Sequence, residues 1–395
     1  MHTREGLALS CVACGWQGDR LDAQRCPDCD GQLAPSYDAD AIDGSSLRAG
    51  LEDSDSQWSV DALVPIGSDG DGVTLGEGAT PLVACPTLGD ELDVETFEIK
   101  DEGHNPTGTV RDRAIAVAAT AAVEAGATDV ALPTTGADGV AAAAYAARAD
   151  LDAHVFVPTR STHTTKAMIN VHGGDMQVVE GRLPHAEDAF ESAIDEEDGW
   201  TPIDPANSPL RAVGPATMGA ELFASADGGV PDAVVVPTGH GEVLAGLHAV
   251  AELLVDLGIL EELPEFHAVQ AEGCAPIVRA FEDDEGTVEG WDSPDTISGA
   301  LEVPDPAFGT HALAAVRESG GRAVAVDDEA ILASACRIAA AEGLQASVAG
   351  GAAAAGAWEL SNAGVFESDD AVVCCNTGAG SLDSDVLRSH LMRAG

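Results

Sequence analysis

The chain has 395 residues and a mass of 40.0 kDa, and 45% of its residues are hydrophobic while only 4% are aromatic. This length suits two domains with an appendage and is ample for a hydrophobic core. The 68 acidic and 18 basic residues give a formal net charge of −50, which disfavours nucleic acid and anionic membranes as partners.

The acidic residues are spread over the expected helices and turns instead of forming one tail. Such a surface is typical of a protein that works in concentrated salt, where self-repulsion is screened. A cation store is the alternative explanation of the acidity. No apolar stretch approaches the roughly 18–20 residues of a membrane span, and Met1–Glu5 lacks the apolar segment of a signal peptide. We therefore expect a halophilic cytoplasmic protein.

Two Cys-x-x-Cys pairs lie near the N-terminus, separated by eleven residues. Four thiolates on paired tight turns suit a tetrahedral zinc ion, which would fold a segment too short for its own core. All four positions would be closed by protein, so we expect a structural role. A ribbon that has lost its metal and an iron site are the alternatives. The candidate ligands are Cys11, Cys14, Cys26 and Cys29.

The region from Pro35 to about Ser68 is rich in Asp, Ser and Gly, and we interpret it as a linker with a docking helix. Strands and Ala-rich helices alternate after it, which predicts parallel sheets covered by helices in two α/β domains. A ligand cleft is expected at the carboxyl ends of the strands. The candidate strands are 130–132, 153–157, 176–179, 233–236, 266–270, 323–326 and 371–374, and the clearest helices are 140–149 and 328–341.

The stretch from Phe97 to Arg113 is the most informative part of the chain. Phe97–Lys100 alternates like a short strand, Asn105–Gly108 has turn chemistry, and an Ala-rich helix follows. A strand, a Gly/Pro turn and a helix N-terminus together predict a site for a phosphate or a carboxylate.

The residues Asn105-Pro106-Thr107-Gly108-Thr109-Val110-Arg111-Asp112-Arg113 resemble the cofactor-lysine motif of threonine synthase and its pyridoxal-phosphate (PLP) relatives of fold type II. Arg111 stands where that family has its Schiff-base lysine. Further matching segments, from Cys11 to about Asp383, include Gly76–Leu82 and the cysteine pairs, which resemble a ribbon of some archaeal members.

The resemblance implies a fold-type II architecture, with two three-layer αβα domains, a cleft between them and a small N-terminal zinc ribbon. The expected boundaries are 1–35 for the ribbon, 36–92 for a linker and the start of the large domain, 93–202 for the small domain and 203–395 for the rest of the large domain. The resemblance also implies a homodimer.

The resemblance assigns three loops to the cofactor. Thr134–Gly139 is similar to the family loop whose Asn reaches the ring oxygen, and Ala137 occupies that position. The glycine-rich phosphate cradle corresponds to Gly239, His240, Gly241, Glu242 and Val243, with Glu242 replacing a glycine. Thr377 matches the hydroxyl that faces the pyridine nitrogen.

The same resemblance assigns the substrate. Thr135 and Gly136 would bind its carboxylate, and Arg211 would bind the phosphate of O-phosphohomoserine. Lys166 matches a further basic position. The alternatives are that Arg211 and Lys166 are ordinary solvated charges, and that the loop is a helix start capped by Asp138.

Arg111 decides the functional expectation, because a guanidinium stays protonated and cannot form the usual Schiff base. It can still hold a phosphate or carboxylate. Together with Ala137 and Glu242 it predicts a catalytically degenerate protein that binds an anionic amino-acid metabolite or non-covalent PLP. The alternatives are an active PLP-dependent lyase that uses Lys100, and a structural or partner-binding protein.

Overall fold

The computed structural model describes residues 6–52, 55–64, 72–197, 199–224 and 229–394. Its strands form three sheets, and the largest has the order β12-β11-β10-β13-β5-β4. All neighbouring pairs in this sheet are parallel except β4 and β5. The strands are β4 (Leu82–Ala84), β5 (Thr96–Asp101), β10 (Ala233–Pro237), β11 (Glu265–Ala271), β12 (Ala323–Val326) and β13 (Ala371–Asn376).

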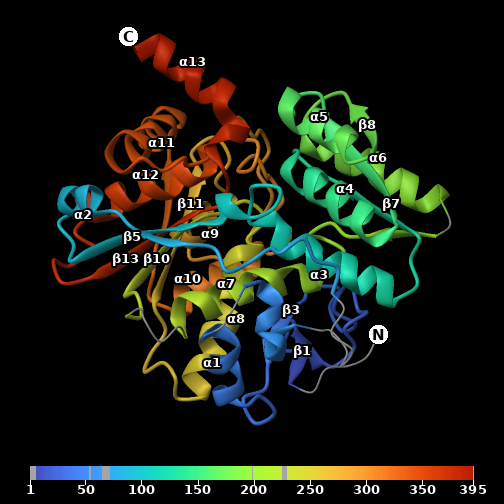
Figure 1. The fold of residues 1–395 in the computed structure, drawn as a ribbon, viewed down its shortest axis with the longest axis horizontal. Helices are drawn as coiled ribbons and strands as arrows, with labels where there is room; N and C mark the ends of the chain where they lie inside the picture. The colour runs from blue at the N-terminus through green and yellow to red at the C-terminus, as the bar shows by residue number, and fades with distance from the viewer. Residues whose placement is uncertain (1–5, 53–54, 65–71, 198, 225–228, 395) are drawn as a thin grey trace.

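Helices cover both faces of this sheet (Figure 1). Successive side chains of a strand point to opposite faces, so both faces of the Val-rich β10 need apolar partners. Val234 and Val236 belong to one core cluster with α7–α10, whereas Val235 belongs to another with α2, α11 and α12. The helices are α2 (Pro86–Leu92), α7 (Val213–Phe223), α8 (Glu242–Asp256), α9 (Pro276–Glu282), α10 (Gly309–Glu318), α11 (Asp328–Glu342) and α12 (Val348–Asn362), and α13 (Ser384–Ala394) follows β13.

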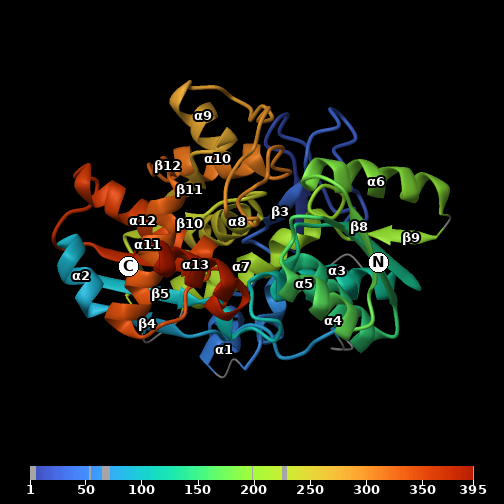
Figure 2. The same ribbon diagram turned by 90° about the horizontal axis from the view of Figure 1, so that it is seen from above.

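A second, parallel sheet of order β8-β7-β6-β9 forms the smaller unit. It lies beside the larger unit in both views (Figure 2). Its core packs α3, α4 and α5 on one face and α6 on the other. The strands are β6 (Asp129–Pro133), β7 (Asp152–Pro158), β8 (Asp175–Val179) and β9 (Trp200–Pro202), and the helices are α3 (Arg111–Glu124), α4 (Ala137–Ala149), α5 (His163–Val171) and α6 (Leu183–Glu196).

The N-terminal segment forms the third sheet, of order β2-β1-β3. Leu9 and Leu33 are fully buried, in a cluster that also contains Val117 of α3 and Leu210. The segment therefore shares its core with the larger fold. Its strands are β1 (Leu7–Ser10), β2 (Gln17–Gly18) and β3 (Ala34–Tyr37).

The expected docking helix is α1 (Gly44–Glu52), whose Leu47 is buried in the core of the larger unit. The other parts of the predicted linker that fall on 53–54 and 65–68 lie outside the described residues, as does Met1–Glu5. Within the described part of the chain, no helix has the length and apolar character that crossing a membrane requires. Short 3-10 helices are η1 (Gln57–Ser59), η2 (Asp61–Leu63), η3 (Glu102–His104), η4 (Pro209–Ala212) and η5 (Gly380–Asp383).

The seven candidate strands and both candidate helices are confirmed, with small shifts at their ends. One boundary differs from the expectation. A small domain that begins at residue 93 would include β5, but β5 pairs with β13 in the larger sheet. The chain enters the smaller unit only at α3, because the strand before the turn and the helix after it belong to different layers.

Candidate functional site

Four segments that follow parallel strands converge between the two units. They are the start of α3 after β5, the start of α4 after β6, the turn between β10 and α8, and the end of β13. Ligands of α/β proteins bind at such strand ends because the connecting loops and helix N-termini meet there. The expected position of the site is therefore reproduced by the fold.

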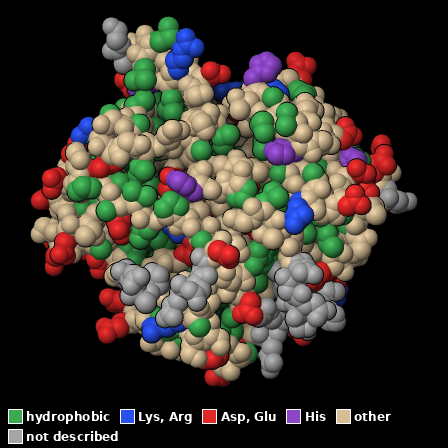
Figure 3. Space-filling view, viewed as in Figure 1, with side chains coloured by type: hydrophobic (Ala, Val, Ile, Leu, Met, Phe, Trp, Pro, Cys, Tyr) green, Lys and Arg blue, Asp and Glu red, His purple; other side chains and the backbone are tan. Residues whose placement is uncertain are grey.

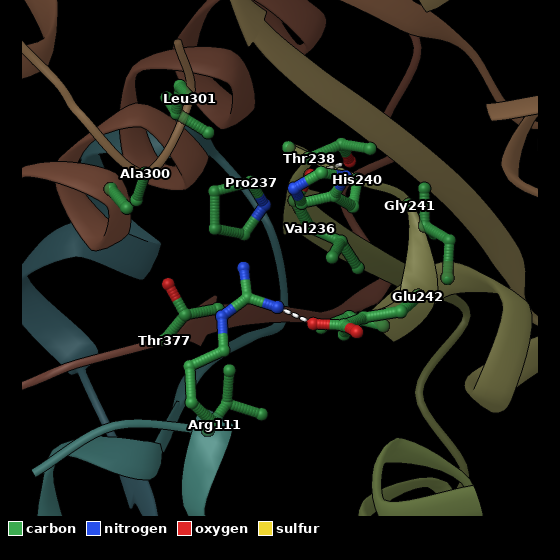
Figure 4. A pocket seen from close by; sticks show the side chains of 15 residues that line it. Arg111, Val236, Pro237, Thr238, His240, Gly241, Glu242, Ala300, Leu301 and Thr377 are labelled. Carbon is green, nitrogen blue, oxygen red and sulfur yellow. Dashed lines mark hydrogen bonds and ion pairs between the residues drawn. The ribbon is translucent and has the colours of Figure 1, made fainter. Parts of the chain in front are cut away.

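Arg111, the first residue of α3, points into this region and forms an ion pair with Glu242 (Figure 4). Its Nε also lies 3.6 Å from Oδ2 of Asp138, on the first turn of α4. The Arg111 side chain is 14% exposed. The residue at the position of the expected Schiff-base lysine is thus already bound to two carboxylates.

Arg211 holds the same two carboxylates from the other side. Its side chain is fully buried, and its Nε donates to Oε2 of Glu242 at 2.9 Å. Nη1 donates to the carbonyl of Ile203 at 3.0 Å, and Nη2 pairs with Asp138. We call Arg111, Arg211, Asp138 and Glu242 the charge quartet. Two positive and two negative groups leave it with no net charge.

The quartet explains how four ionisable groups can be buried together. Burial alone would raise the pKa of the Asp138 carboxyl, but Arg211 and Arg111 outweigh it and lower that pKa to about 2. Burial and Arg111 lower the pKa of the neighbouring His240 to about 3, so this imidazole is neutral at pH 7. Buried charges persist when each one has partners, and removal of one partner is costly.

The glycines of the cradle are required by close backbone contacts. A Cβ on Gly241, whose φ is +89°, would lie 2.8 Å from the carbonyl oxygen of Phe308. A Cβ on Gly239 would lie 2.5 Å from the carbonyl oxygen of Ala300. Gly239 and Gly241 are therefore required for this turn to pack against Ala300 and Phe308. Glu242, at the first position of α8, carries its side chain into the quartet.

Little space remains beside the quartet. The cavity lined by Arg111, Thr377 and residues 236–244 has a volume of about 20 Å³. A single water needs roughly 10–15 Å³ measured in the same way. A phosphate and a pyridine ring do not fit beside these side chains as they lie. The small cavity therefore has no room for PLP beside the quartet, and Arg111 offers no amine for a Schiff base.

A larger cavity of about 120 Å³ opens on the other side of Arg111. The starts of α4, α5 and α12 line it, together with Asp383. Helix N-termini carry unpaired N–H groups and a partial positive charge, which favour an anion. The hydroxyl groups around the cavity come from Thr109, Thr135, Thr162, Thr165, Ser298, Ser347 and Thr377.

The predicted site residues separate into three groups. Thr135, Ala137 and Thr377 line the larger cavity. Gly136, which lies between Thr135 and Ala137 in the sequence, is the residue before α4. Gly136 has φ +148°, and a Cβ there would lie 3.0 Å from Oγ1 of Thr165. The cradle residues His240 and Val243 line the small cavity, together with Glu242, Gly239 and Gly241.

The other two predicted substrate residues are engaged elsewhere. Arg211 belongs to the quartet and lines neither cavity. Lys166 donates from Nζ to the carbonyl of Thr159 at 2.7 Å and also lies outside both linings. Asp138 does not cap α4, because the capping position is Gly136 and no side chain caps it.

Lys100, the alternative amine, is buried away from the two cavities. Its Nζ lies 2.6 Å from Oε2 of Glu221 and donates to the carbonyl of Thr80 at 2.7 Å. Glu221 also pairs with the fully buried Arg113. Lys100 and Lys166 are the chain's two lysines, so neither cavity has a lysine in its lining.

Two contributions to this site were missed from the sequence. The first is Asp138, which looked like a helix cap although it is a partner of Arg111. The sequence did offer a signal. Two loops of the expected cofactor site carry a carboxylate, Asp138 and Glu242, in a chain that has Arg111 at the expected lysine position. The second is the Ser and Thr set of the larger cavity. Only the tertiary structure brings Thr162 and Ser298 to one place.

The four cysteines of the N-terminal segment form a cluster whose sulfur atoms lie within 4.8 Å of one another. Cys11 and Cys29 have their Sγ atoms 3.6 Å apart, as do Cys14 and Cys26. Sulfur ligands at about 2.3 Å from a tetrahedral zinc ion would be separated by a similar distance. The cluster can therefore hold a metal ion.

Comparison with known proteins agrees with this architecture. The family described as "Pyridoxal-phosphate dependent enzyme" matches residues 73–378. A threonine synthase of Methanosarcina acetivorans is 33% identical over 374 residues, covering 94% of this chain and 91% of that protein. A threonine synthase of Methanocaldococcus jannaschii is 30% identical over 377 residues, covering 95% and 93%.

Solved structures with low sequence identity share the fold. An L-serine ammonia-lyase of Rhizomucor miehei has a TM-score of 0.68 and 21% identity, covering 80% of this chain and 98% of that one. Threonine deaminase isoform 2 of Solanum lycopersicum has a TM-score of 0.66 and 19% identity, covering 80% and 88%. The predicted fold-type II architecture is thus confirmed. Because the family match and these relatives extend over most of its length, the chain belongs to the pyridoxal-phosphate dependent enzyme family and is threonine synthase-like.

Proposed function

We propose that this protein is a catalytically degenerate member of its family that binds a small amino acid in the larger cavity instead of using PLP. The charge quartet is the observation that carries this proposal. A guanidinium bound to two carboxylates is neither a nucleophile nor a base near neutral pH. The quartet also leaves about 20 Å³ where the cofactor phosphate would be expected.

The chemistry of the larger cavity supports a carboxylate ligand. The start of α4, which no side chain caps, and several hydroxyl groups offer donors to an anion, as the resemblance implied for Thr135 and Gly136. The starts of α5 and α12 are capped by Thr162 and Ser347. Asp383 offers a carboxylate on the same lining, which suits a ligand ammonium group. A group of each sign on one small molecule describes an amino acid.

The size of the cavity limits the ligand. An engineered cavity of about 150 Å³ binds benzene, so about 120 Å³ suits a ligand of similar size and not PLP. Several relatives are named threonine synthase, which makes L-threonine the first candidate. A phosphorylated metabolite is a weaker candidate, because Arg211 is already bound to Glu242 and Asp138.

Calorimetric titration with L-threonine in concentrated potassium chloride tests ligand binding. We expect binding at one site per chain and weaker binding by Thr135→Val, which removes a hydroxyl of the cavity. Thr96→Val makes the same chemical change at an exposed position of β5 and should bind like the unmodified protein. No heat with L-threonine, L-serine or homoserine would contradict the ligand assignment.

Incubation with PLP followed by borohydride tests the loss of cofactor chemistry. We expect no lysine adduct in the peptide map, because Lys100 is paired with Glu221 and Lys166 with the Thr159 carbonyl. A stoichiometric adduct on either lysine would contradict the proposal. It would favour the second candidate, a PLP-dependent lyase, which the family membership supports.

We further propose that the cysteine cluster holds a structural zinc ion. Its four sulfur ligands leave no position open for a substrate. One zinc ion per chain is expected by elemental analysis of the purified protein, and Cys26→Ser should lose it. Iron in place of zinc would contradict the choice of metal.

A further inference from the structure

A second group of candidate metal ligands lies where the N-terminal segment meets the larger unit. His248 and Glu252 are one turn apart on α8, and Glu318 is the last residue of α10. The Nδ1 atom of His248 is 3.6 Å from Oε2 of Glu252, and its Nε2 atom is 3.2 Å from Oε2 of Glu318. One ligand atom from each residue lies within 4.8 Å of the other two.

The His248 ring cannot donate a hydrogen bond to both neighbouring carboxylates while it is neutral. The His248 side chain is 11% exposed, and its two ring nitrogens face the two carboxylates. A neutral imidazole has one N–H group and one lone pair. It can donate to one of the two carboxylates, and the other then faces the lone pair.

The two carboxylates also repel each other. One oxygen atom of Glu252 lies within 4.8 Å of one oxygen atom of Glu318. Among the described residues, neither Glu252 nor Glu318 forms an ion pair with an arginine or a lysine. A cation between them would relieve this repulsion.

The space for such a cation is present. The three side chains line a cavity of about 240 Å³ between α8, α10 and the strands β1 and β3. His311 of α10 lines the same cavity, and its ring lies within hydrogen-bond reach of the backbone of Ser10. The cavity thus has room for an ion, for its water ligands and for a fourth protein ligand.

We propose that His248, Glu252 and Glu318 bind a divalent transition-metal ion, with His311 beside it. Imidazole nitrogen with carboxylate oxygen suits Zn²⁺ and its first-row neighbours, whereas an all-oxygen site would suit Mg²⁺ or Ca²⁺. This site is separate from the cysteine cluster, although Cys11 also lines the cavity.

The ion would link α8 to α10 at the surface on which the N-terminal segment lies. Ala34 of β3 packs in one cluster with Ala245 of α8 and Phe308, the residue before α10. Metal binding would therefore stabilise the surface on which the N-terminal segment docks.

The test uses the full chain after one equivalent of Zn²⁺ has been bound by its cysteine cluster. Titration with Co²⁺ in concentrated potassium chloride should show one additional ion per chain. Its absorption bands should lack the intense thiolate-to-cobalt transitions that a cysteine site would give. The double variant Glu252→Gln with Glu318→Gln, and separately His248→Asn, should weaken binding by at least about tenfold, since each change removes a direct ligand.

The matched control is Glu261→Gln with Glu262→Gln, which removes the same two charges from exposed positions of another surface. It should bind Co²⁺ as the unmodified protein does. Equal weakening in control and test variants would mean unspecific attraction to an acidic surface and would overturn the proposal. The absence of a second ion would do the same. Circular dichroism of each variant verifies that the fold is intact.

Discussion

At the scale of single residues, the burial of the Arg111 charge is explained by its partners. A guanidinium placed alone in the buried cradle would carry an uncompensated charge, which costs several kcal/mol. Glu242 and Asp138 supply the opposite charges, and Arg211 binds both of them. Arg111 and Glu242 therefore compensate each other's charge in the buried site.

Restoring the family residues tests this coupling. Arg111→Lys alone should gain no PLP adduct, because the new ammonium group would pair with Glu242. Combined with Glu242→Gly, which removes the carboxylate from the cradle, it should gain a borohydride-reducible adduct at position 111. The measurement is mass spectrometry of peptides after PLP treatment and reduction. Equal labelling of the single and double variants would show that Glu242 does not block the site.

The quartet also predicts a pH dependence of stability. The pKa of Asp138 is about 2 in the folded protein and lies below its ordinary value of 3.8. Its contribution to the free energy of unfolding is therefore complete above about pH 4 and is lost as the pH falls toward 2. The expected size is about 2 kcal/mol.

Urea unfolding at several pH values measures this contribution. The difference between the unmodified protein and Asp138→Asn should shrink as the pH falls from about 5 toward 2. Asp385→Asn, at an exposed position of α13, should run parallel to the unmodified protein over the same range. A constant difference for Asp138→Asn would show that the quartet does not lower the pKa of Asp138.

At the scale of elements, small residues set how closely α12 packs on the larger sheet. Gly356 lies where a Cβ would be 2.3 Å from Cγ2 of Val269 on β11. Gly351 allows an equally close contact with α11, because a Cβ there would be 2.4 Å from the carbonyl oxygen of Ile331. The Ala-rich and Gly-rich composition of this helix therefore reflects close packing.

Gly356→Ala should lower the free energy of unfolding by about 1–3 kcal/mol, because one extra methyl group overpacks the contact with β11. Chemical denaturation in concentrated salt measures the change. Gly286→Ala is the matched control, since a Cβ there meets no atom within 4 Å. A Gly356 variant as stable as the control would mean that α12 can move away from the sheet at little cost.

At the scale of the whole molecule, the net charge of −50 dominates the surface. Acidic side chains are scattered over the face shown in Figure 3, with few basic ones among them. Arg113 and Arg211, which each form ion pairs with two carboxylates, are fully buried and do not contribute to that surface. Exposed carboxylates therefore repel one another with little local compensation.

This arrangement predicts that salt stabilises the fold. The melting temperature should rise with potassium chloride concentration while repulsion between exposed carboxylates is screened, because the Debye length falls from about 10 Å at 0.1 M to about 3 Å at 1 M. Differential scanning calorimetry measures the effect. Sucrose controls for general solute exclusion, and a melting temperature independent of salt would contradict the expected halophilic character.

The local patterns of the chain determined much of its description. Strand positions follow from alternation and turn residues, and the cysteine cluster follows from motif spacing. The family and its fold type followed from the resemblance of local motifs to those of known proteins. The substitution of Arg111 was equally visible. What Arg111 contacts was not, because Asp138 and Arg211 lie 27 and 100 residues further along the chain.

Only the tertiary structure decided the state of the site. The sequence left open whether Glu242 would be paired or turned away, and whether Lys100 could reach the cofactor position. The fold brings Arg211 to Glu242 and commits Lys100 to Glu221, so it closes the cradle and leaves a cavity beside it. Motifs follow from local sequence, whereas the balance of buried charges depends on which distant side chains the fold brings together.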